Sequence, residues 1–506
     1  MYKKVEMEKR ACILLVLMIL VVGCSSTLEV GIERTPTPDP AAPATIAALR
    51  TENARLATRV AIQVTPTPAP LDLGQLAYVQ GGDIWVKALP DGKPLRLTTD
   101  GRNREPRWAP SGDWLAFRKE RATFVQREVP CDIPQPHRGN EVCREAFSLL
   151  QKQVWLMQAD GSRAHVLDQG SSVEGFSWAP THDRLAYVSE NGDLQTINAD
   201  GSKAATLVPH NLTNPNPGRV GRMAWSPDGA WIGYEWRIPQ SEPSASYQGL
   251  WKVSADGKTR VELHASGAPR KGEAILAGWS PRGSTVLFWQ SEMRTPSLTD
   301  SVALYGVSHL KDSEGFSIVK SITTAMLAYA DFIAPAPPGT SWGERDAVAI
   351  VVGAGHGTWT NKSIETVKPL TPKDVAAISP AWSPTGTRLA YAAMPTREDL
   401  TIGEVTLQDL MQRRLWVVET SGEGHPRRLT NAAAYRDEHP LWSADSTHLL
   451  FARLDMRGRA SLWLIAVDTG ATRQMVDELT PAPDPFGFYG HVDWDGLFDW
   501  WRGSGT

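Results

Sequence analysis

The sequence has little cysteine, no strong excess of charge of either sign and one long hydrophobic run. Of its 506 residues, four are Cys, and 52 Lys and Arg face 56 Asp and Glu, so the net charge is -4. This balance argues against a nucleic-acid partner, because contacts to phosphates need clustered basic side chains. A composition of 42% hydrophobic and 21% charged residues also excludes collagen-like, wholly disordered and polytopic membrane proteins.

The hydrophobic run covers residues 11–22 and follows the basic residues of positions 3–10. It has the length of a signal-peptide core and is too short to span a membrane as a helix. It ends in Val21-Val22-Gly23-Cys24, which resembles the bacterial lipobox. That resemblance implies cleavage before Cys24 and lipidation of its thiol. We therefore expect a signal peptide at 1–23 and a lipid anchor on the extracytoplasmic face of a bacterial envelope, at the cell surface or in the periplasm. A plain secretory signal with a chance Cys is the alternative.

Cysteine usage agrees with export. Cys12 would leave with the signal peptide and Cys24 would carry the lipid, so that Cys131 and Cys143 remain. Outside the cytoplasm such a pair usually forms a disulfide. A metal site is the rival interpretation, but two further ligands at suitable spacing are missing.

Residues 24–74 have the features of a stalk. Pro-rich stretches at both ends indicate extended spacers, and a short helix is expected between them, at 44–63. Within 46–60, hydrophobic residues and one central Asn, Asn53, recur at alternating spacings of three and four, a pattern that favours a parallel two-stranded coil. Two heptads are marginal in water, so the pattern predicts either a weak parallel homodimer or a spacer helix.

Tryptophan, glycine and proline are abundant, with 20 Trp, 42 Gly and 37 Pro. Many of them belong to one phrase, typified by Trp-Ser-Pro-Asp-Gly followed by a strand-like run. A degenerate copy is expected at Asp331–Pro335 with Ala347–Val352, and a half-copy at Val492–Gly496. The clear copies are Trp108–Phe117, Trp178–Tyr187, Trp225–Tyr234, Trp279–Phe288, Trp382–Tyr391 and Trp442–Phe451.

Each phrase predicts a strand, a tight turn and a second strand, and two further strands follow it. Four antiparallel strands at a period of roughly 50 residues are typical of a β-propeller, so the fold class is all-β. From residue 75 to 502 the repeats resemble the WSPDG family of TolB-type propellers, which also occurs in the propeller half of prolyl-oligopeptidase-type peptidases. A stalk stands where TolB-type proteins carry a small α/β domain.

The blade count follows from where the repeats begin. Leu76–Val79 is a second strand with no motif Trp before it, so the missing first strand is expected in His491–Trp500. The ring would then close by pairing the two ends of the 75–502 region, leaving 503–506 as a tail. Eight blades are favoured, and seven are the alternative if the degenerate copy is only an insertion.

Long loops are expected on one face of the propeller only. Strand directions alternate within a blade, so second-to-third loops and links between blades share a face. Long ordered loops on a rigid scaffold are where binding usually occurs. The segments concerned are 119–151, 237–248, 290–300, 394–413, 209–221 and 480–490.

Candidate site residues lie three positions before each motif Trp, where innermost strands begin around the channel mouth. Two imidazoles and a carboxylate, His439, His491 and Glu105, could bind a divalent metal there; the alternative is a polar, hydrated mouth without cofactor. Gly339-Thr-Ser341-Trp-Gly343 matches a nucleophile elbow but lacks the strand before it and the helix after it, and is expected to be a loop. The full set at the mouth is Glu105, Gly175, Arg222, Leu276, Ser379, His439 and His491.

Two functions fit these patterns, and a third alternative is a purely structural spacer, in which substitutions on the long-loop face would have no effect. The first is a membrane-anchored binding or scaffold propeller whose long-loop face receives an envelope protein or glycan. The second is a metal-assisted saccharide lyase or hydrolase that uses the channel mouth, and it requires His439 and His491.

Overall fold

The structure is a computed structural model. The chain divides into two units, Met1–Pro70 and Leu71–Thr506. In the described part of the chain, no helix combines the length and hydrophobicity needed to cross a membrane. The described residues are 47–53, 71–130, 142–210, 218–238, 247–265, 274–290, 302–311, 317–326, 329–352, 363–365, 369–396, 406–422, 424–485 and 490–503.

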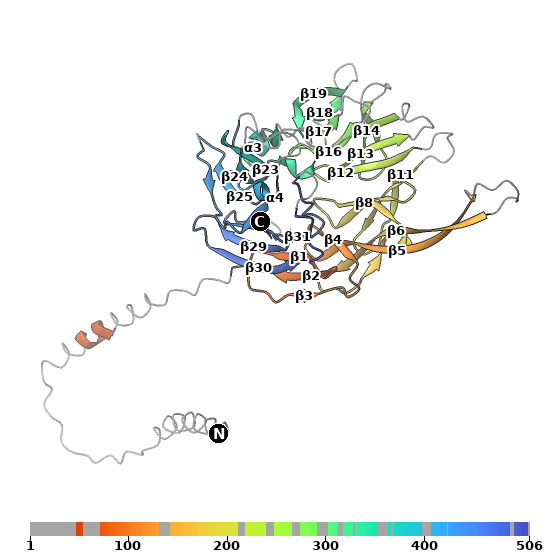
Figure 1. Cartoon of the computed structure of the whole chain (residues 1–506). Coiled ribbons are helices and arrows are strands. Elements are labelled where there is room, and N and C mark those ends of the chain that lie inside the picture. Colours follow the sequence, from red (N-terminus) through yellow and green to blue (C-terminus); the bar gives the residue numbers. More distant parts are fainter. Residues whose placement is uncertain are drawn as a thin grey trace, which may run out of the picture. The chain divides into compact units, whose positions relative to one another are not determined.

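Antiparallel sheets in a ring build the second unit, as Figure 1 shows. Blade 1 joins the two ends of this unit, and blades 2–4 follow it along the chain. A 3-10 helix, η1 (Leu167–Gly170), links blades 2 and 3. The strands are β31 (Phe498–Trp501), β1 (Gln75–Gln80), β2 (Asp83–Ala88) and β3 (Leu95–Arg96) in blade 1; β4 (Asn103–Trp108), β5 (Trp114–Pro130), β6 (Val142–Gln158) and β7 (His165–Val166) in blade 2; β8 (Val173–Trp178), β9 (Arg184–Ser189), β10 (Leu194–Asn198) and β11 (Ala205–Val208) in blade 3; β12 (Arg219–Trp225), β13 (Trp231–Ile238), β14 (Tyr247–Ser254) and β15 (Arg260–Ala265) in blade 4.

The second half of the ring contains three more four-stranded blades and one sheet of three strands. Short helices, η3 (Ala330–Phe332), α3 (Ser341–Glu344) and α4 (Leu407–Leu410), lie between strands. The strands are β16 (Ala274–Trp279), β17 (Thr285–Gln290), β18 (Val302–Lys311) and β19 (Ser317–Met326) in blade 5; β20 (Ile333–Pro335), β21 (Val348–Val352) and β22 (Ser363–Glu365) in the three-stranded sheet; β23 (Val375–Trp382), β24 (Arg388–Pro395), β25 (Arg414–Glu419) and β26 (Arg427–Arg428) in blade 6; β27 (Tyr435–Trp442), β28 (His448–Asp455), β29 (Ala460–Ala466) and β30 (Thr472–Leu479) in blade 7.

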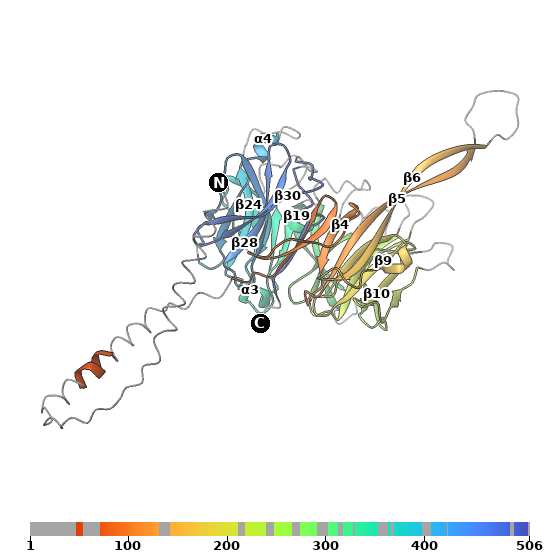
Figure 2. The ribbon, with the colours of Figure 1, turned by 90° about the horizontal axis from the view of Figure 1, so that it is seen from below.

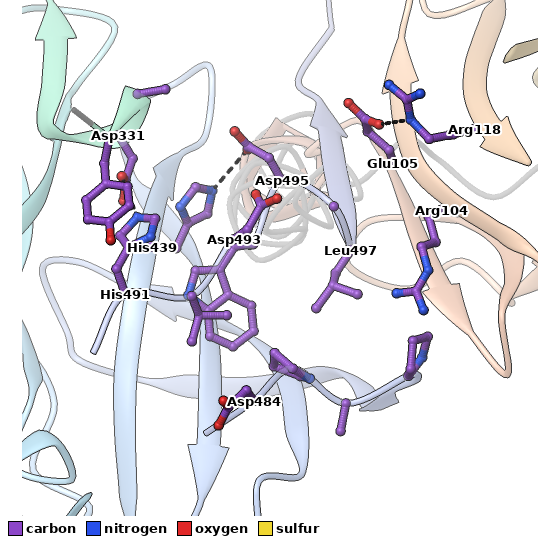
Figure 3. Close-up of a pocket in the computed structure, with 18 of the residues that line it drawn as sticks. Arg104, Glu105, Arg118, Asp331, His439, Asp484, His491, Asp493, Asp495 and Leu497 are labelled. Atoms are coloured by element: carbon purple, nitrogen blue, oxygen red, sulfur yellow. Dashed lines mark hydrogen bonds and ion pairs between the residues drawn. The ribbon is translucent and has the colours of Figure 1, made fainter. Parts of the chain in front are cut away.

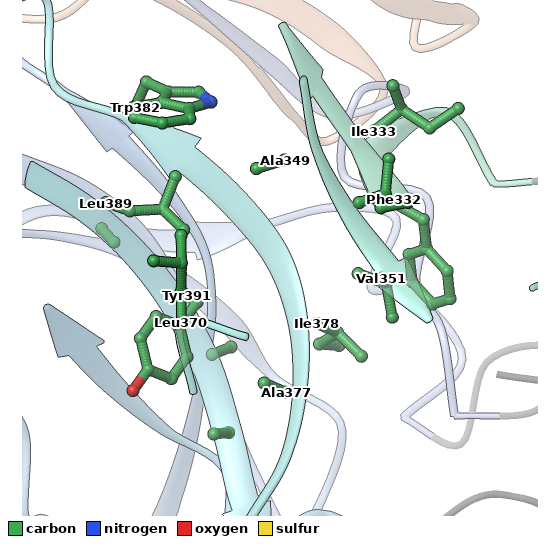
Figure 4. Close-up of a cluster of buried hydrophobic side chains, with 14 of the residues drawn as sticks. Phe332, Ile333, Ala349, Val351, Leu370, Ala377, Ile378, Trp382, Leu389 and Tyr391 are labelled. Carbon is green, nitrogen blue, oxygen red and sulfur yellow. The ribbon is translucent and has the colours of Figure 1, made fainter. Parts of the chain in front are cut away.

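The predicted all-β propeller is confirmed, with seven four-stranded blades. This is the alternative count of the sequence prediction rather than the favoured one. The degenerate copy, β20 with β21, forms the three-stranded sheet between blades 5 and 6 instead of an eighth full blade. Figure 4 shows the physical basis: Phe332, Ile333 and Val351 of this region lie among hydrophobic side chains of blade 6, in one buried cluster.

The ring closes as predicted, by antiparallel pairing of β1 with β31. One detail of the prediction is wrong. Trp500 pairs with Leu76, just as Trp108 pairs with Leu115, so Trp500 occupies the position of a motif Trp. Trp494 of the predicted half-copy precedes this strand. The half-copy matches the residues of the motif. In the strand pairing, however, the motif position is taken by Trp500, six residues after Trp494, because side-chain burial determines the register.

The motif tryptophans join neighbouring sheets. In five of the six clear copies the indole N–H donates to a backbone carbonyl of the preceding sheet, and the acceptor is usually the residue just before that sheet's own motif Trp. Because these carbonyls are buried, such bonds satisfy groups that would otherwise be costly to desolvate. The bonds are Trp178 to Arg107, Trp225 to Ser177, Trp279 to Ala224, Trp382 to Ala334 and Trp442 to Ala381, at 2.9–3.2 Å.

The other residues of the motif, Ser, Asp and Gly, form the turns. In blade 4 the Ser226 hydroxyl accepts from the Trp231 N–H at 2.9 Å and donates to Asp228 Oδ1 at 2.5 Å. Gly229 adopts a φ of +70°, which costs a residue without Cβ nothing. Blade 7 repeats the arrangement with Ser443 and Asp445. The motif therefore specifies a tight turn in which the Ser and Asp side chains hydrogen-bond to each other and Ser also accepts from the backbone.

A long two-stranded arm replaces the loop predicted at 119–151. Strands β5 and β6 pair over their full length, to Pro130 opposite Val142. Figures 1 and 2 show them extending well beyond the other blades. Among the described strands, β4 and β7 pair only with the ends of β5 and β6 that lie in the blade, so the arm is two-stranded beyond them and carries no copy of the motif that marks the blades. Cys131 lies outside the described residues, so the expected Cys131–Cys143 disulfide stays a prediction.

Two smaller expectations concern helices. In the stalk, residues 47–53 are helical, within the predicted 44–63, and Leu49 is exposed. The homodimer predicted through 46–60 and the rest of that helix lie outside the described residues.

Near the Gly-x-Ser-x-Gly match, Ser341–Glu344 forms one helical turn instead of a loop, because the Thr340 side chain caps it by accepting from the Gly343 N–H. No strand leads directly into Ser341, so the match is not a nucleophile elbow.

Candidate functional site at the channel mouth

A β-bulge interrupts innermost strands near the channel mouth. In β4, β23 and β27 the pairing register shifts at a residue followed by proline: Glu105, Ser379 and His439. These three residues have φ values of +54°, +51° and +53°. Positive φ is uncommon for residues with a Cβ, and bulges redirect side chains. At these three of the predicted positions, the bulge therefore breaks the regular alternation of side chains along the strand and redirects the side chain.

The mouth cavity has a volume of about 990 Å³ and opens where the innermost strands begin. Glu105, Arg222, His439 and His491 all line it, so the structure brings together four of the side chains predicted from the sequence. Ser379 is buried behind its wall, where its hydroxyl donates to Asp331 Oδ2 at 2.7 Å. Glu120 and Lys152, at the base of the arm, form part of the rim. The arm and the cavity therefore share one face.

Residues 480–497, named here the closing segment, run between β30 and β31 and supply much of the cavity lining. Several bonds hold its described part to different sheets. Gly496 O accepts from the Glu105 N–H at 2.9 Å, and Gly490 O accepts from Arg413 Nη1 at 2.5 Å. The Trp494 indole N–H donates to Glu438 Oε2 at 3.1 Å. The segment is thus part of the wall of a formed cavity.

His491 joins the closing segment to η3. Its Nε2 lies 2.6 Å from Asp331 Oδ1, and its ring stacks on Tyr329 with centroids 3.9 Å apart. Burial raises the pKa of Asp331, but the charge and hydrogen bond of His491 and the Ser379 hydroxyl outweigh burial, so the pKa is below its usual value. Figure 3 shows His491 beside Asp331 at one side of the cavity.

The other two predicted metal ligands have separate partners. Glu105 Oε2 accepts from Arg118 Nε at 2.6 Å, and His439 Nε2 lies 3.7 Å from Asp495 Oδ1. In Figure 3 Glu105 and the two histidines lie at opposite sides of the cavity. Among the described residues, no three His, Cys, Asp or Glu side chains are grouped to hold a metal ion. The structure therefore does not bring His439, His491 and Glu105 together around one centre, because each of them bonds to a separate partner.

A buried ionic cluster supports the wall behind His439. Glu438, 2% exposed, binds Arg413 Nη1 at 2.5 Å and lies 3.3 Å from Arg436 Nε. Burial raises the pKa of Glu438, yet the two arginines lower it further, so the group is held as a carboxylate. Because it also accepts from Trp494, this cluster fixes the closing segment against blade 7.

Carboxylates of the closing segment add negative charge to the mouth cavity. Burial and the neighbouring Asp495 charge raise the pKa of Asp493, and the Arg107 guanidinium opposes them. The sequence prediction missed Asp331, Asp493 and Asp495 as lining residues. Asp493 and Asp495 belong to the predicted half-copy, where the motif predicts a turn. Their place in the cavity lining follows only when Trp500, and not Trp494, is taken as the motif Trp.

A second cavity, named here the arginine cavity, has a volume of about 700 Å³ and shares Arg222 and Ala330 with the mouth cavity. Gly175 and Leu276, predicted for the mouth, line this cavity instead. Three arginines and one glutamate lie on its wall, Arg219, Arg222, Arg237 and Glu174. The equivalent strand positions are therefore divided between two adjoining cavities.

Comparison with known proteins supports the fold alone. No family model matches the chain. A dihydro-heme d1 dehydrogenase, NirN, is 11% identical with a TM-score of 0.51, over 82% of this chain and 76% of its own. A prolyl endopeptidase is 11% identical with a TM-score of 0.47, over 76% of this chain and only 50% of its own. An oligogalacturonate lyase in complex with manganese is 11% identical with a TM-score of 0.41, over 85% and 97%. At this identity, the likeness to NirN supports the overall fold and nothing beyond it.

Proposed function

We propose that this protein is a binding or scaffold propeller, and that the face carrying the arm and the mouth cavity receives a protein partner. The observation that carries the proposal is the position of Glu120 and Lys152, which belong both to the arm and to the cavity rim. A rigid ring thus presents a projecting hairpin next to a polar cavity. Such a combination offers a partner both an edge to contact and a recess to enter.

The cavity chemistry supports binding. Glu105 pairs with Arg118, His491 with Asp331, and His439 with Asp495. Side chains already oriented by their neighbours form a preorganised polar surface, which lowers the entropy cost of binding. Replacing both His439 and His491 by Ala should leave partner capture at the arm largely intact, whereas a metal-assisted lyase would lose all activity.

In-cell photocrosslinking tests the proposal. A photoreactive residue at Ala122 or Leu150, paired exposed positions at the base of the arm, should give a discrete protein adduct. The same residue at Lys203 or Lys258, in exposed turns on the opposite face, is the control. Adducts from both faces, or from neither, would contradict the proposal. A saccharide adduct would identify a glycan as the partner instead.

We further propose that Cys24 is lipidated and tethers the propeller to the extracytoplasmic face of a bacterial membrane. The support is the basic start, the hydrophobic run at 11–22 and the lipobox-like ending. Metabolic labelling with an alkyne fatty acid should mark the wild-type protein, and Cys24→Ser should remove the label. Equal labelling of both would refute the anchor.

A further inference from the structure

The arginine cavity is built around a buried carboxylate. Glu235 in β13 is 0% exposed, and its two oxygens accept from the Leu276 N–H at 2.8 Å and the Arg222 N–H at 3.1 Å. Arg237 Nη2 also donates to Glu235 Oε2 at 2.6 Å. One side chain therefore fixes the strand starts of blades 4 and 5 and orients a guanidinium at the cavity wall.

A bulge in β12 places Arg222 in this cavity. The pairing register shifts between Val220 and Met223, so Gly221 and Arg222 together stand opposite the single residue Glu235. A Cβ at Gly221 would lie only 2.5 Å from Glu235 Oε2 and 2.9 Å from Arg237 Nε. A side chain at position 221 would therefore displace the Glu235–Arg237 pair from its place beside the bulge. The local sequence is thus fitted to this arrangement of charges.

The remaining lining combines two arginines and Glu174 with hydrophobic surface. The guanidinium carbon of Arg222 lies 6.0 Å from the ring centroid of Trp289, and Arg219 Nη2 donates to Glu190 O at 3.1 Å. No carboxylate pairs with either guanidinium among the described ion pairs. The hydrophobic part of the wall consists of Phe176, Val220, Met223, Leu276, Ala277 and Trp289.

We infer that the arginine cavity binds a carboxylate side chain of an acidic peptide segment with flanking hydrophobic residues. A guanidinium matches a carboxylate with two parallel hydrogen bonds, and Glu235 preorients one of the two arginines that lie next to it. The inference rests on the proposed function, for which it names the chemistry of the partner. The arginines and the hydrophobic wall favour an acidic peptide over a neutral saccharide, whose hydroxyl groups would meet no Asn, Gln, Ser, Thr or Tyr side chain in the described lining of this cavity.

Titration calorimetry on the purified full-length protein in detergent tests the inference. The probe is an acetylated, amidated tetrapeptide, leucine–aspartate–aspartate–leucine, and its asparagine counterpart is the neutral control. The aspartate peptide should bind and the asparagine peptide should not. Arg222→Gln should weaken binding about tenfold or more, because one charge-assisted contact is lost. Arg428→Gln, an exposed arginine of β26 that lines neither cavity, should leave it unchanged.

Arg222→Lys keeps the charge without the planar fork and should give an intermediate affinity, which covers the case in which Arg222→Gln fails to fold. Equal binding of both peptides, or undiminished binding by the Arg222 variants, would overturn the inference. Binding of inorganic phosphate without binding of the aspartate peptide would overturn it in favour of a phosphoryl ligand. The crosslinking result is independent: an adduct at Ala122 would still support the proposed function if the peptide failed to bind.

Discussion

At the scale of single residues, the motif Trp has two roles. Its ring fills the space between sheets, and its indole N–H reaches the preceding sheet in five observed cases. Trp108 is a natural exception, since its indole nitrogen is buried without a hydrogen-bond partner in the described structure. The two roles can therefore be separated by experiment within one chain.

Trp442→Phe should lower the free energy of unfolding more than Trp108→Phe does. Both replacements remove similar buried ring area, but only the first leaves the Ala381 carbonyl without its donor at 2.9 Å. The difference should be about 1–3 kcal/mol, the cost of an unsatisfied buried polar group. Urea unfolding followed by fluorescence measures both variants. Equal losses would show that the indole hydrogen bond contributes nothing.

Asp331 should make stability depend on pH. Because its pKa is lowered in the folded protein, the unfolded chain binds its proton more tightly. The stabilisation is therefore complete above the ordinary pKa of Asp, about 3.9, and is lost as pH falls through the lower folded value.

Asp331→Asn should accordingly cost about 1–3 kcal/mol at pH 5.5, where the charge-assisted bond to His491 at 2.6 Å is present. The cost should shrink towards pH 3. Thermal unfolding across this range, with Asp484→Asn as a comparison from the same cavity, measures it. A cost independent of pH would show that the carboxylate charge is not responsible.

At the scale of elements, the blades were predictable and the arm was not. The Trp-Ser-Pro-Asp-Gly phrase predicts its strands and turn because each letter fills a local role, as Ser226 and Asp228 show. The arm lies inside a repeat and carries no such phrase, so it was expected to be a loop. Strands β5 and β6 are consecutive, with only residues 131–141 between them, but neither strand carries a regular alternation or a turn motif that would indicate their pairing register.

The candidate site was likewise predictable only in part. Glu105, Arg222, His439 and His491 were found from their distance to a Trp, since that distance places them where innermost strands begin. His491 was found by a wrong count from Trp494, yet it lies in the cavity because the closing segment crosses the mouth. The bond to Asp331 joins residues 160 positions apart and could not be predicted.

Gly112 gives an element-scale prediction. It has a φ of +78°, and a Cβ there would lie 2.4 Å from the Trp501 ring of the closing blade. Gly112→Ala should destabilise by both backbone strain and a clash, about 2–4 kcal/mol together. Gly470→Ala, with a φ of +74° and open space around it, should show the strain alone. Thermal denaturation should therefore rank the first variant below the second; the reverse order would exclude the clash.

At the scale of the whole molecule, stability depends on one closing blade. Strand β31 supplies β1 with its inner partner, and Phe498 and Trp500 are buried there. Ending the chain at residue 497 removes these side chains and leaves β1 with one neighbour. We expect a loss of at least about 5 kcal/mol, by comparison with single truncations of large buried side chains.

Calorimetry should show a lower and broader transition for the shortened chain. Ending it at residue 502 instead, beyond β31, is the matched control and should keep the native transition. A normal transition for the chain ending at 497 would mean that the ring does not depend on its closure.

The same closure determines how the propeller responds to a mechanical load. Residue 71 leads directly into β1, which lies between β2 and β31. Under the proposed anchoring through the N-terminal segment, a pull on the proposed partner enters the ring at β1. Where the pull runs along this strand, the backbone bonds on both sides of it are loaded together in shear, rather than broken one after another from an end. An inner strand of the closing blade is therefore a strong point at which to hold the ring under tension.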